Sequence, residues 1–120
     1  MADLGQSAVI RYVDMPTRKM ANGGESRDVV RGTLATGEVV ALHESTQVAG
    51  MTPNPAHPIQ HTEFILIFEG TVDFSHDGKV ERVGPGGILY VAKGTVHQVK
   101  NVGDGPARYC VVAIGGDVKA

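Results

Sequence analysis

Short runs of apolar and polar residues, separated by glycine, proline and Asp-Gly pairs, fill most of this chain. Runs rich in Val, Ile, Thr, Tyr and Phe favour strands, while glycine and proline mark turns. No long segment repeats its apolar residues with helical spacing, so the pattern predicts an all-β fold. The expected strands are 8–13, 27–35, 38–44, 63–69, 71–75, 79–83, 87–91, 96–101 and 108–114, with a weaker strand over 57–61.

The expected turns divide these strands into a barrel or a sandwich. Asp77-Gly78 suits the positive φ angles of a tight hairpin turn between two strands. Pro53 and Pro55 make the segment before residue 57 a stiff connector rather than a central strand. Nine or ten short strands at such spacing are typical of β-sandwiches and β-barrels.

One strand is apolar on both faces. Successive side chains of a strand point to opposite sides, and the run Phe64-Ile65-Leu66-Ile67-Phe68 has no polar side. Because a strand of a lone barrel would turn one face to water, the run predicts that something covers its outer side. We expect a homodimer. Two packed sheets within one subunit are the alternative.

Composition narrows the class of protein. The chain has 120 residues, 42% of them hydrophobic and 20% charged, with a formal net charge of −2, which fits one ordinary globular domain. It has no basic cluster, no apolar stretch long enough to cross a bilayer and no secretory leader, so we expect neither nucleic acid nor a membrane as partner. Cys110 is the sole cysteine and suits a small buried hydrophobe in a reducing compartment. We expect a cytoplasmic protein, with export after removal of a leader as the alternative.

The candidate chemistry lies in the stretch from His57 to Glu63. On a strand, residues two apart share a face, so His57, His61 and Glu63 would point the same way. His61 and Glu63 are close enough to bind one ion, whereas His57 joins them only if the chain bends. Pro58 is a plausible place for that bend, because its ring restricts φ and it donates no backbone hydrogen bond.

A later strand offers one more ligand, His97, which shares a face with Val99 and Asn101. Three neutral imidazoles and one carboxylate suit Fe(II), Mn(II), Ni(II), Cu(II) or Zn(II). Four protein ligands would leave one or two positions for substrate or dioxygen. His43 and His76 are expected to be ordinary surface or core residues, since neither has a partner at ligand spacing.

These residues resemble the motifs of the cupin superfamily over roughly residues 50–101. In the first motif, G-x5-H-x-H-x3/4-E-x6-G, His57 matches the first histidine, and six residues separate Glu63 from Gly70. The second motif, G-x5-P-x-G-x2-H-x3-N, is matched at Gly86, Gly94, His97 and Asn101, with Ala92 in place of proline. The 15 residues between Gly70 and Gly86 resemble the short gap of small microbial cupins.

Two departures from the motif concern the site. The linker from Gly50 to His57 is one residue longer than the template, and Ile59 occupies the position of the second histidine. His61 lies two residues further on and therefore keeps the same face. It either replaces the missing ligand or lines the pocket beside a poorer site.

The resemblance implies a double-stranded β-helix (jelly-roll) barrel, formed by about residues 26–116 of a single domain spanning 1–120, with residues 1–25 as an N-terminal strand arm. It implies one divalent transition metal, preferably Fe(II) or Mn(II), held by His57, His61, Glu63 and His97. Ile59, Ile65, Ile67 and Val99 would form an apolar wall, with Glu63 and Gln60 as weak candidates for a catalytic group.

The implied function is that of a metal-dependent enzyme acting on a small organic molecule, with an oxidoreductase of dioxygenase type as the leading expectation. A metal-dependent isomerase or lyase is one alternative. Another is a binding module without turnover, and a third is a dimeric scaffold whose site has degenerated.

Overall fold

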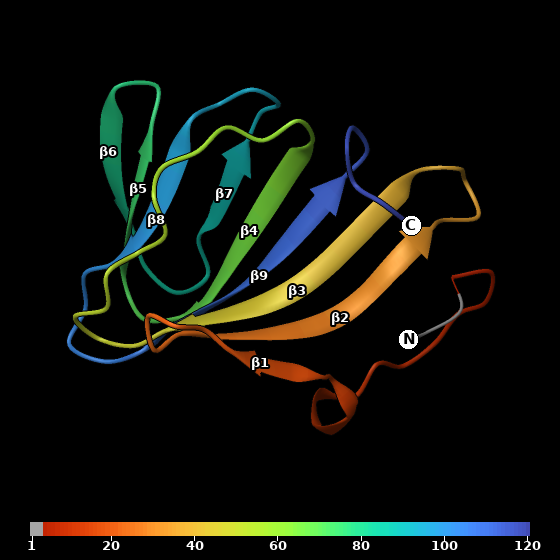
Figure 1. Cartoon of the computed structure of the whole chain (residues 1–120), viewed down its shortest axis with the longest axis horizontal. Coiled ribbons are helices and arrows are strands. Elements are labelled where there is room, and N and C mark those ends of the chain that lie inside the picture. The colour runs from red at the N-terminus through yellow and green to blue at the C-terminus, as the bar shows by residue number, and fades with distance from the viewer. Residues whose placement is uncertain (1–3) are drawn as a thin grey trace.

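Antiparallel strands in two sheets enclose one hydrophobic core (Figure 1). The computed structural model describes residues 4–120. The larger sheet has the order β1 (Thr17–Lys19), β2 (Glu25–Thr33), β3 (Val39–Gln47), β9 (Ala107–Ile114), β4 (Thr62–Glu69) and β7 (Ile88–Val91). The smaller has the order β6 (Lys79–Val83), β5 (Val72–His76) and β8 (His97–Asn101), and a short 3₁₀ helix, η1 (Tyr12–Asp14), precedes β1. The predicted all-β class is confirmed.

The core consists of inward-facing residues from both sheets. Along β9 the buried positions alternate strictly, which places Ala107, Tyr109, Val111 and Ala113 inside. The smaller sheet adds Val72 and Phe74, and β4 adds its isoleucines. Burying one such aliphatic side chain contributes about 1.5–3 kcal/mol relative to leaving it in water. The alternation of β9 therefore determines which face of the larger sheet turns inward.

The strand register extends this inner face to polar residues. Antiparallel partners point to the same side of a sheet. Buried Val111 pairs with Ile65 on β4 and with His43 on β3. Buried Ala113 pairs with Glu63 and with Ala41. His43 and Glu63 consequently both face the interior.

Two predicted local features follow from backbone conformation. The β5–β6 hairpin turns at Asp77 and Gly78, whose φ angles of 49° and 75° are those expected for an Asp-Gly hairpin turn. Gly70 has a φ of +82°, and a Cβ at this position would lie 2.5 Å from the carbonyl oxygen of Pro106. The motif glycine therefore permits a close approach of the chain between β4 and β5.

Two expectations about strands are wrong. Residues 8–13 form no strand, because the segment pairs with nothing in residues 4–120 and ends in η1. There the Tyr12 ring lies under the guanidinium of Arg27, 4.2 Å from its centroid. Residues 57–61 likewise form no strand. Only His57 is paired, in an isolated bridge with His97, and Pro58 next to it has no N–H to donate.

Within the described part of the chain, no helix is long and apolar enough to cross a membrane.

Candidate functional site

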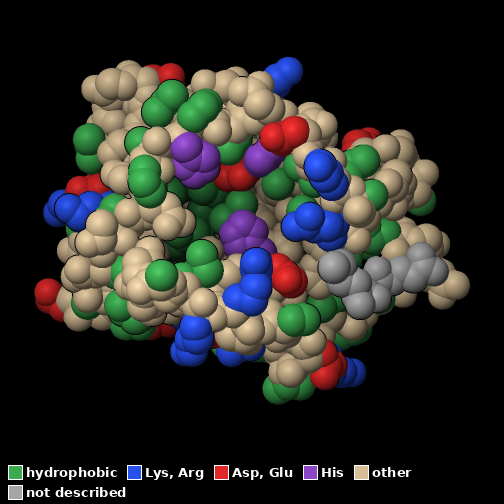
Figure 2. All heavy atoms as spheres, viewed as in Figure 1, with side chains coloured by type: hydrophobic (Ala, Val, Ile, Leu, Met, Phe, Trp, Pro, Cys, Tyr) green, Lys and Arg blue, Asp and Glu red, His purple; other side chains and the backbone are tan. Residues whose placement is uncertain are grey.

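A cavity of about 690 Å³ opens into the barrel between the larger sheet and β8. Figure 2 shows histidine side chains around a hollow in this face, with basic side chains along one side of it. The lining includes the residues expected to bind metal, apart from His61, and much of the inner face of β2 and β3. Its apolar part includes Ile65, Val99 and Val111, whereas Ile59 and Ile67 belong to the core behind it.

His57 and His97 are brought together by a backbone bridge. The N–H of each residue donates to the carbonyl oxygen of the other, at 3.2 and 3.1 Å. Their ring centroids are 5.0 Å apart. His97 is 5% exposed, while His57 stands at the exposed rim. The chain leaves this bridge at Pro58 and bends at Gln60 and His61, two residues beyond the bend that the sequence suggested.

Backbone carbonyls fix the tautomer of both rings. The Nδ1 atom of His57 lies 3.1 Å from the carbonyl oxygen of Pro55, and that of His97 lies 3.1 Å from the oxygen of Thr95. A carbonyl oxygen only accepts, so each Nδ1 carries the proton, and each Nε2 keeps a free lone pair. Histidines that ligate metals are held in this way, by an N–H donated to a carbonyl or carboxylate.

Glu63 lies between His97 and His61. Its Oε1 atom is 4.0 Å from Nε2 of His97, and its Oε2 atom is 2.7 Å from Nε2 of His61. Nδ1 of His61 is 2.6 Å from a carboxylate oxygen of Asp117. Burial alone would lower the pKa of His61, but hydrogen bonds to Glu63 and Asp117 outweigh it and raise the pKa.

The donor chemistry at this point suits a metal, although the residues are not closed around one. Among residues 4–120, no three His, Cys, Asp or Glu side chains stand close enough to enclose an ion. His97 Nε2 and Glu63 Oε1 are both lone-pair donors, and their 4.0 Å separation is about twice a ligand bond of ~2.0–2.2 Å. His57, Glu63 and His97 therefore fit a divalent metal in donor type, and the two histidines also in tautomer, whereas both nitrogens of His61 already face carboxylates.

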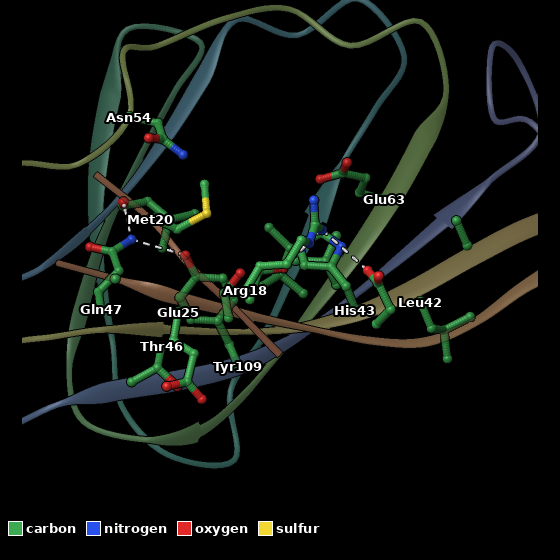
Figure 3. Close-up of a pocket in the computed structure, with 18 of the residues that line it drawn as sticks. Arg18, Met20, Glu25, Leu42, His43, Thr46, Gln47, Asn54, Glu63 and Tyr109 are labelled. Carbon is green, nitrogen blue, oxygen red and sulfur yellow. Dashed lines mark hydrogen bonds and ion pairs between the residues drawn. The ribbon is translucent and has the colours of Figure 1, made fainter. Parts of the chain in front are cut away.

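His43 is the cavity residue that sequence reasoning missed. It faces the cavity from β3, two strands away from Glu63 in the same sheet, and both side chains are visible in Figure 3. Burial lowers its pKa, so the ring is neutral near pH 7. The available signal was the alternation of polar His43, Ser45 and Gln47 along one face of a strand whose inward side was not yet known.

The remaining motif positions have structural roles. Ile59 is 5% exposed and packs in the core where the motif has a histidine. Asn101 is buried, and its side-chain amide donates to the backbone oxygens of Gln47 and Gly105, at 3.0 and 2.9 Å. Asn101 thus anchors the loop after β8 instead of lining the cavity.

Two other residues named from the sequence lie outside the cavity. Gln60 is exposed, and its carbonyl oxygen accepts from the N–H of Asp117. His76 ends β5 beside the predicted turn, stacked on Phe74 at 4.5 Å between centroids and bonded to Glu81 at 2.6 Å. It therefore serves the β5–β6 hairpin.

Fold and cavity together define a small jelly-roll barrel with a histidine-lined pocket inside. A family model for the cupin domain matches residues 42–113, more than half of the chain. The chain belongs to the cupin family, as its motifs predict.

Solved structures with the same fold extend beyond this match. A predicted oxalate decarboxylase from Thermotoga maritima is 19% identical, with a TM-score of 0.72 over 89% of this chain and 98% of that one. An RmlC-like cupin from Shewanella frigidimarina is 12% identical, with a TM-score of 0.76 over 93% and 94%. The polyketide cyclase RemF from Streptomyces resistomycificus is 16% identical, with a TM-score of 0.73 over 96% and 88%. Such identities establish the fold alone, and no curated protein matches the sequence.

Proposed function

We propose that the chain is a metal-dependent cupin enzyme acting on a small organic molecule, with the metal held by His57, Glu63 and His97. The observation that carries this is the fixed tautomer of the two histidines, which leaves each Nε2 lone pair free in or beside the cavity. Three protein ligands leave positions for substrate on a five- or six-coordinate ion. Fe(II) or Mn(II) suits this nitrogen and oxygen set, and Ni(II), Cu(II) or Zn(II) would also fit.

A divalent ion there would supply Lewis-acid or redox chemistry, and an oxidoreductase of dioxygenase type is the reaction class we favour. The protein's own contribution is positional. Ile65, Val99 and Val111 present an apolar wall that keeps water from part of a bound molecule. His61 holds the Glu63 carboxylate in place through its Nε2 atom, and we assign it as a positioning residue.

A second candidate is a binding module that holds metal or a small ligand without turnover. It is favoured by Ile59, which removes one histidine from the motif, and by the engagement of His61 with two carboxylates. A protein with a loosely held ion would bind ligands and yet catalyse their conversion poorly.

Metal analysis tests the proposal directly. Protein purified without chelator should carry near-stoichiometric iron or manganese, and His97→Ala and Glu63→Ala should lower the content at least tenfold. His76→Ala is the matched control, because His76 lies outside this cavity, and it should retain the metal. Absence of bound metal after loading with Fe(II), Mn(II), Ni(II), Cu(II) and Zn(II) in turn would refute the proposal. Oxygen uptake with enols, diketones and catechols then separates turnover from binding.

A further inference from the structure

A β-bulge in β2 determines which of its charged residues face the cavity. Asp28 pairs with His43 of β3, but the next pair is Val30 with Leu42, so Val29 is an extra residue. Arg31 then pairs with Ala41, in the same row as inward-facing Glu63. In a regular strand Arg31 would share the outer face of Arg27, four residues earlier. The bulge therefore turns Arg31 inward, and bulges often re-aim side chains beside active sites.

Arg31 is the cation at the cavity that no neighbouring carboxylate neutralises. Arg18 also faces inward (Figure 3), and its guanidinium lies 3.2 Å from Asp28. Glu63 is bonded to His61 at 2.7 Å. Arg31 lines the cavity and makes no ion pair or side-chain hydrogen bond within residues 4–120.

The surroundings of Arg31 leave its charge for a ligand. His43 faces the same part of the cavity, and Arg31 and Arg18 both act on it to disfavour its charged form, as burial does more strongly. The charges facing His43 are thus Asp28 and Arg31 from β2, Arg18 from β1 and Glu63 from β4. Asp28 and Arg18 pair with each other, and Glu63 is bonded to His61. Arg31 is therefore the one of these charged groups that has no ion-pair partner among residues 4–120.

We propose that the cavity takes a small organic carboxylate and that the Arg31 guanidinium binds its carboxylate group. A guanidinium presents its N–H donors as a planar fork that matches a carboxylate in a bidentate contact. One unpaired cation matches a single negative charge, whereas a phosphate dianion would carry one charge too many. The inference rests on the cavity proposed above as the functional site, and it identifies the class of ligand.

Calorimetric titration of metal-free protein tests it apart from the metal. The probes are butyrate and benzoate, each compared with its uncharged amide, together with inorganic phosphate. We expect a carboxylate to bind at least tenfold more tightly than its amide and than phosphate. Arg31→Gln should weaken that binding roughly tenfold or more, because a hydrogen bond to a charged group is lost. Arg31→Lys keeps the charge without the planar fork, so its affinity for the carboxylate should lie between those of the wild type and Arg31→Gln.

Arg27→Gln is the matched control, since Arg27 lies on the opposite face of the same strand, and it should bind as the wild type does. The Arg31 side chain is exposed, so its variants should melt as the wild type does. In the wild type, the NMR signal of the Arg31 side-chain Nε–H should shift on addition of the bound carboxylate, which needs no variant. Carboxylates that bind no better than their amides, tighter binding of phosphate, or unchanged binding by Arg31→Gln would overturn the inference. Metal content is measured separately, so a protein that takes metal but not carboxylate, or the reverse, identifies which proposal fails.

Discussion

His61 differs from His57 and His97, because both of its ring nitrogens face carboxylates. His57 and His97 donate to backbone carbonyls and keep a free nitrogen, whereas His61 joins Glu63 to Asp117. A histidine in this position fixes a carboxylate more readily than it binds an ion. Because residues 57–61 form no strand, the shift of two residues from the motif position does not preserve a strand face, and it gives His61 other partners.

Removal of one carboxylate partner should lower the pKa of His61. In Asp117→Asn, one of the hydrogen bonds that offset burial is weakened, so an NMR titration of metal-free protein should give a lower pKa than in the wild type. The wild-type pKa of His61 is raised above 6.5, so protonated His61 stabilises the folded state fully below about pH 6.5. This stabilisation is lost as pH rises through the pKa of His61 in the folded state. The variant's loss of stability should therefore be larger at pH 6 than at pH 9. An equal loss at both would contradict the assignment.

His61→Ala separates the two roles left open by the sequence. If His61 only positions Glu63, metal content should fall severalfold but persist, and the carboxylate probes should still bind. If it is itself a ligand, the loss should equal that of His97→Ala. Metal content of the two variants, measured side by side, decides between these outcomes.

At the scale of the element, the turn after β9 holds the edge of the site through a close backbone contact. A Cβ on Gly116, whose φ is +53°, would lie 1.8 Å from the carbonyl oxygen of Gln60. At Gly115, with a φ of +69°, a Cβ would meet nothing within 4 Å. Asp117 follows directly, so this turn presents it to His61.

The two glycines make a matched pair of variants. Gly115→Ala should cost roughly 1–2 kcal/mol for an alanine held in the left-handed region. Gly116→Ala should cost more, because the same strain is joined by a clash with backbone, and it should also lower the pKa of His61. Urea unfolding and NMR titration measure both effects. Equal costs would show that the contact with Gln60 relaxes freely.

Local signals predicted many elements, and non-local pairing decided the others. The Asp77-Gly78 hairpin follows from turn chemistry, and β6 was predicted with its observed bounds. β1 was missed because Thr17, Arg18 and Lys19 are all exposed and show no alternation. Residues 8–13 looked like a strand but found no partner.

The residues of the candidate site also fall into those that the sequence predicted and those that depend on non-local pairing. Spacing and the motif resemblance predicted His57, Glu63 and His97 as ligands, and the structure places all three at the cavity, because fixed offsets along the chain survive small errors in strand bounds. His43 and Arg31 could not be placed, since the side they face depends on the pairing of β3 with β9 and on the bulge in β2. The contact of His61 with Asp117 could not be predicted either, because Asp117 is 56 residues away along the chain.

At the scale of the whole molecule, the outer face of the larger sheet is apolar and open. Phe64 and Tyr90 are 40% and 56% exposed, with ring centroids 5.2 Å apart, while Ile65 and Ile67 of the same strand are buried. The strand is thus apolar on both sides, as the sequence showed. A homodimer through this face stays our expectation.

A charged residue on this face should separate the subunits. Tyr90→Lys should give a monomer in sedimentation equilibrium where the wild type gives a dimer, because it places two like charges in the apolar contact. Lys100→Ala, on an exposed position of the smaller sheet, is the control and should leave the dimer intact. A wild type that is monomeric at micromolar concentration would contradict the expectation.

The extra residue at Val29 has a consequence for how relatives of this chain should be compared. A relative that lacks this residue would keep the later pairs with β3, so its later residues would face the same sides as here, while each would stand one position nearer to Asp28 along the chain. An alignment without a gap would then place residues of opposite faces in one column, and it would compare an arginine inside the barrel with a residue outside it. Alignments and ancestral reconstructions of this strand should therefore be anchored on the partners in β3, with a gap placed at the bulge.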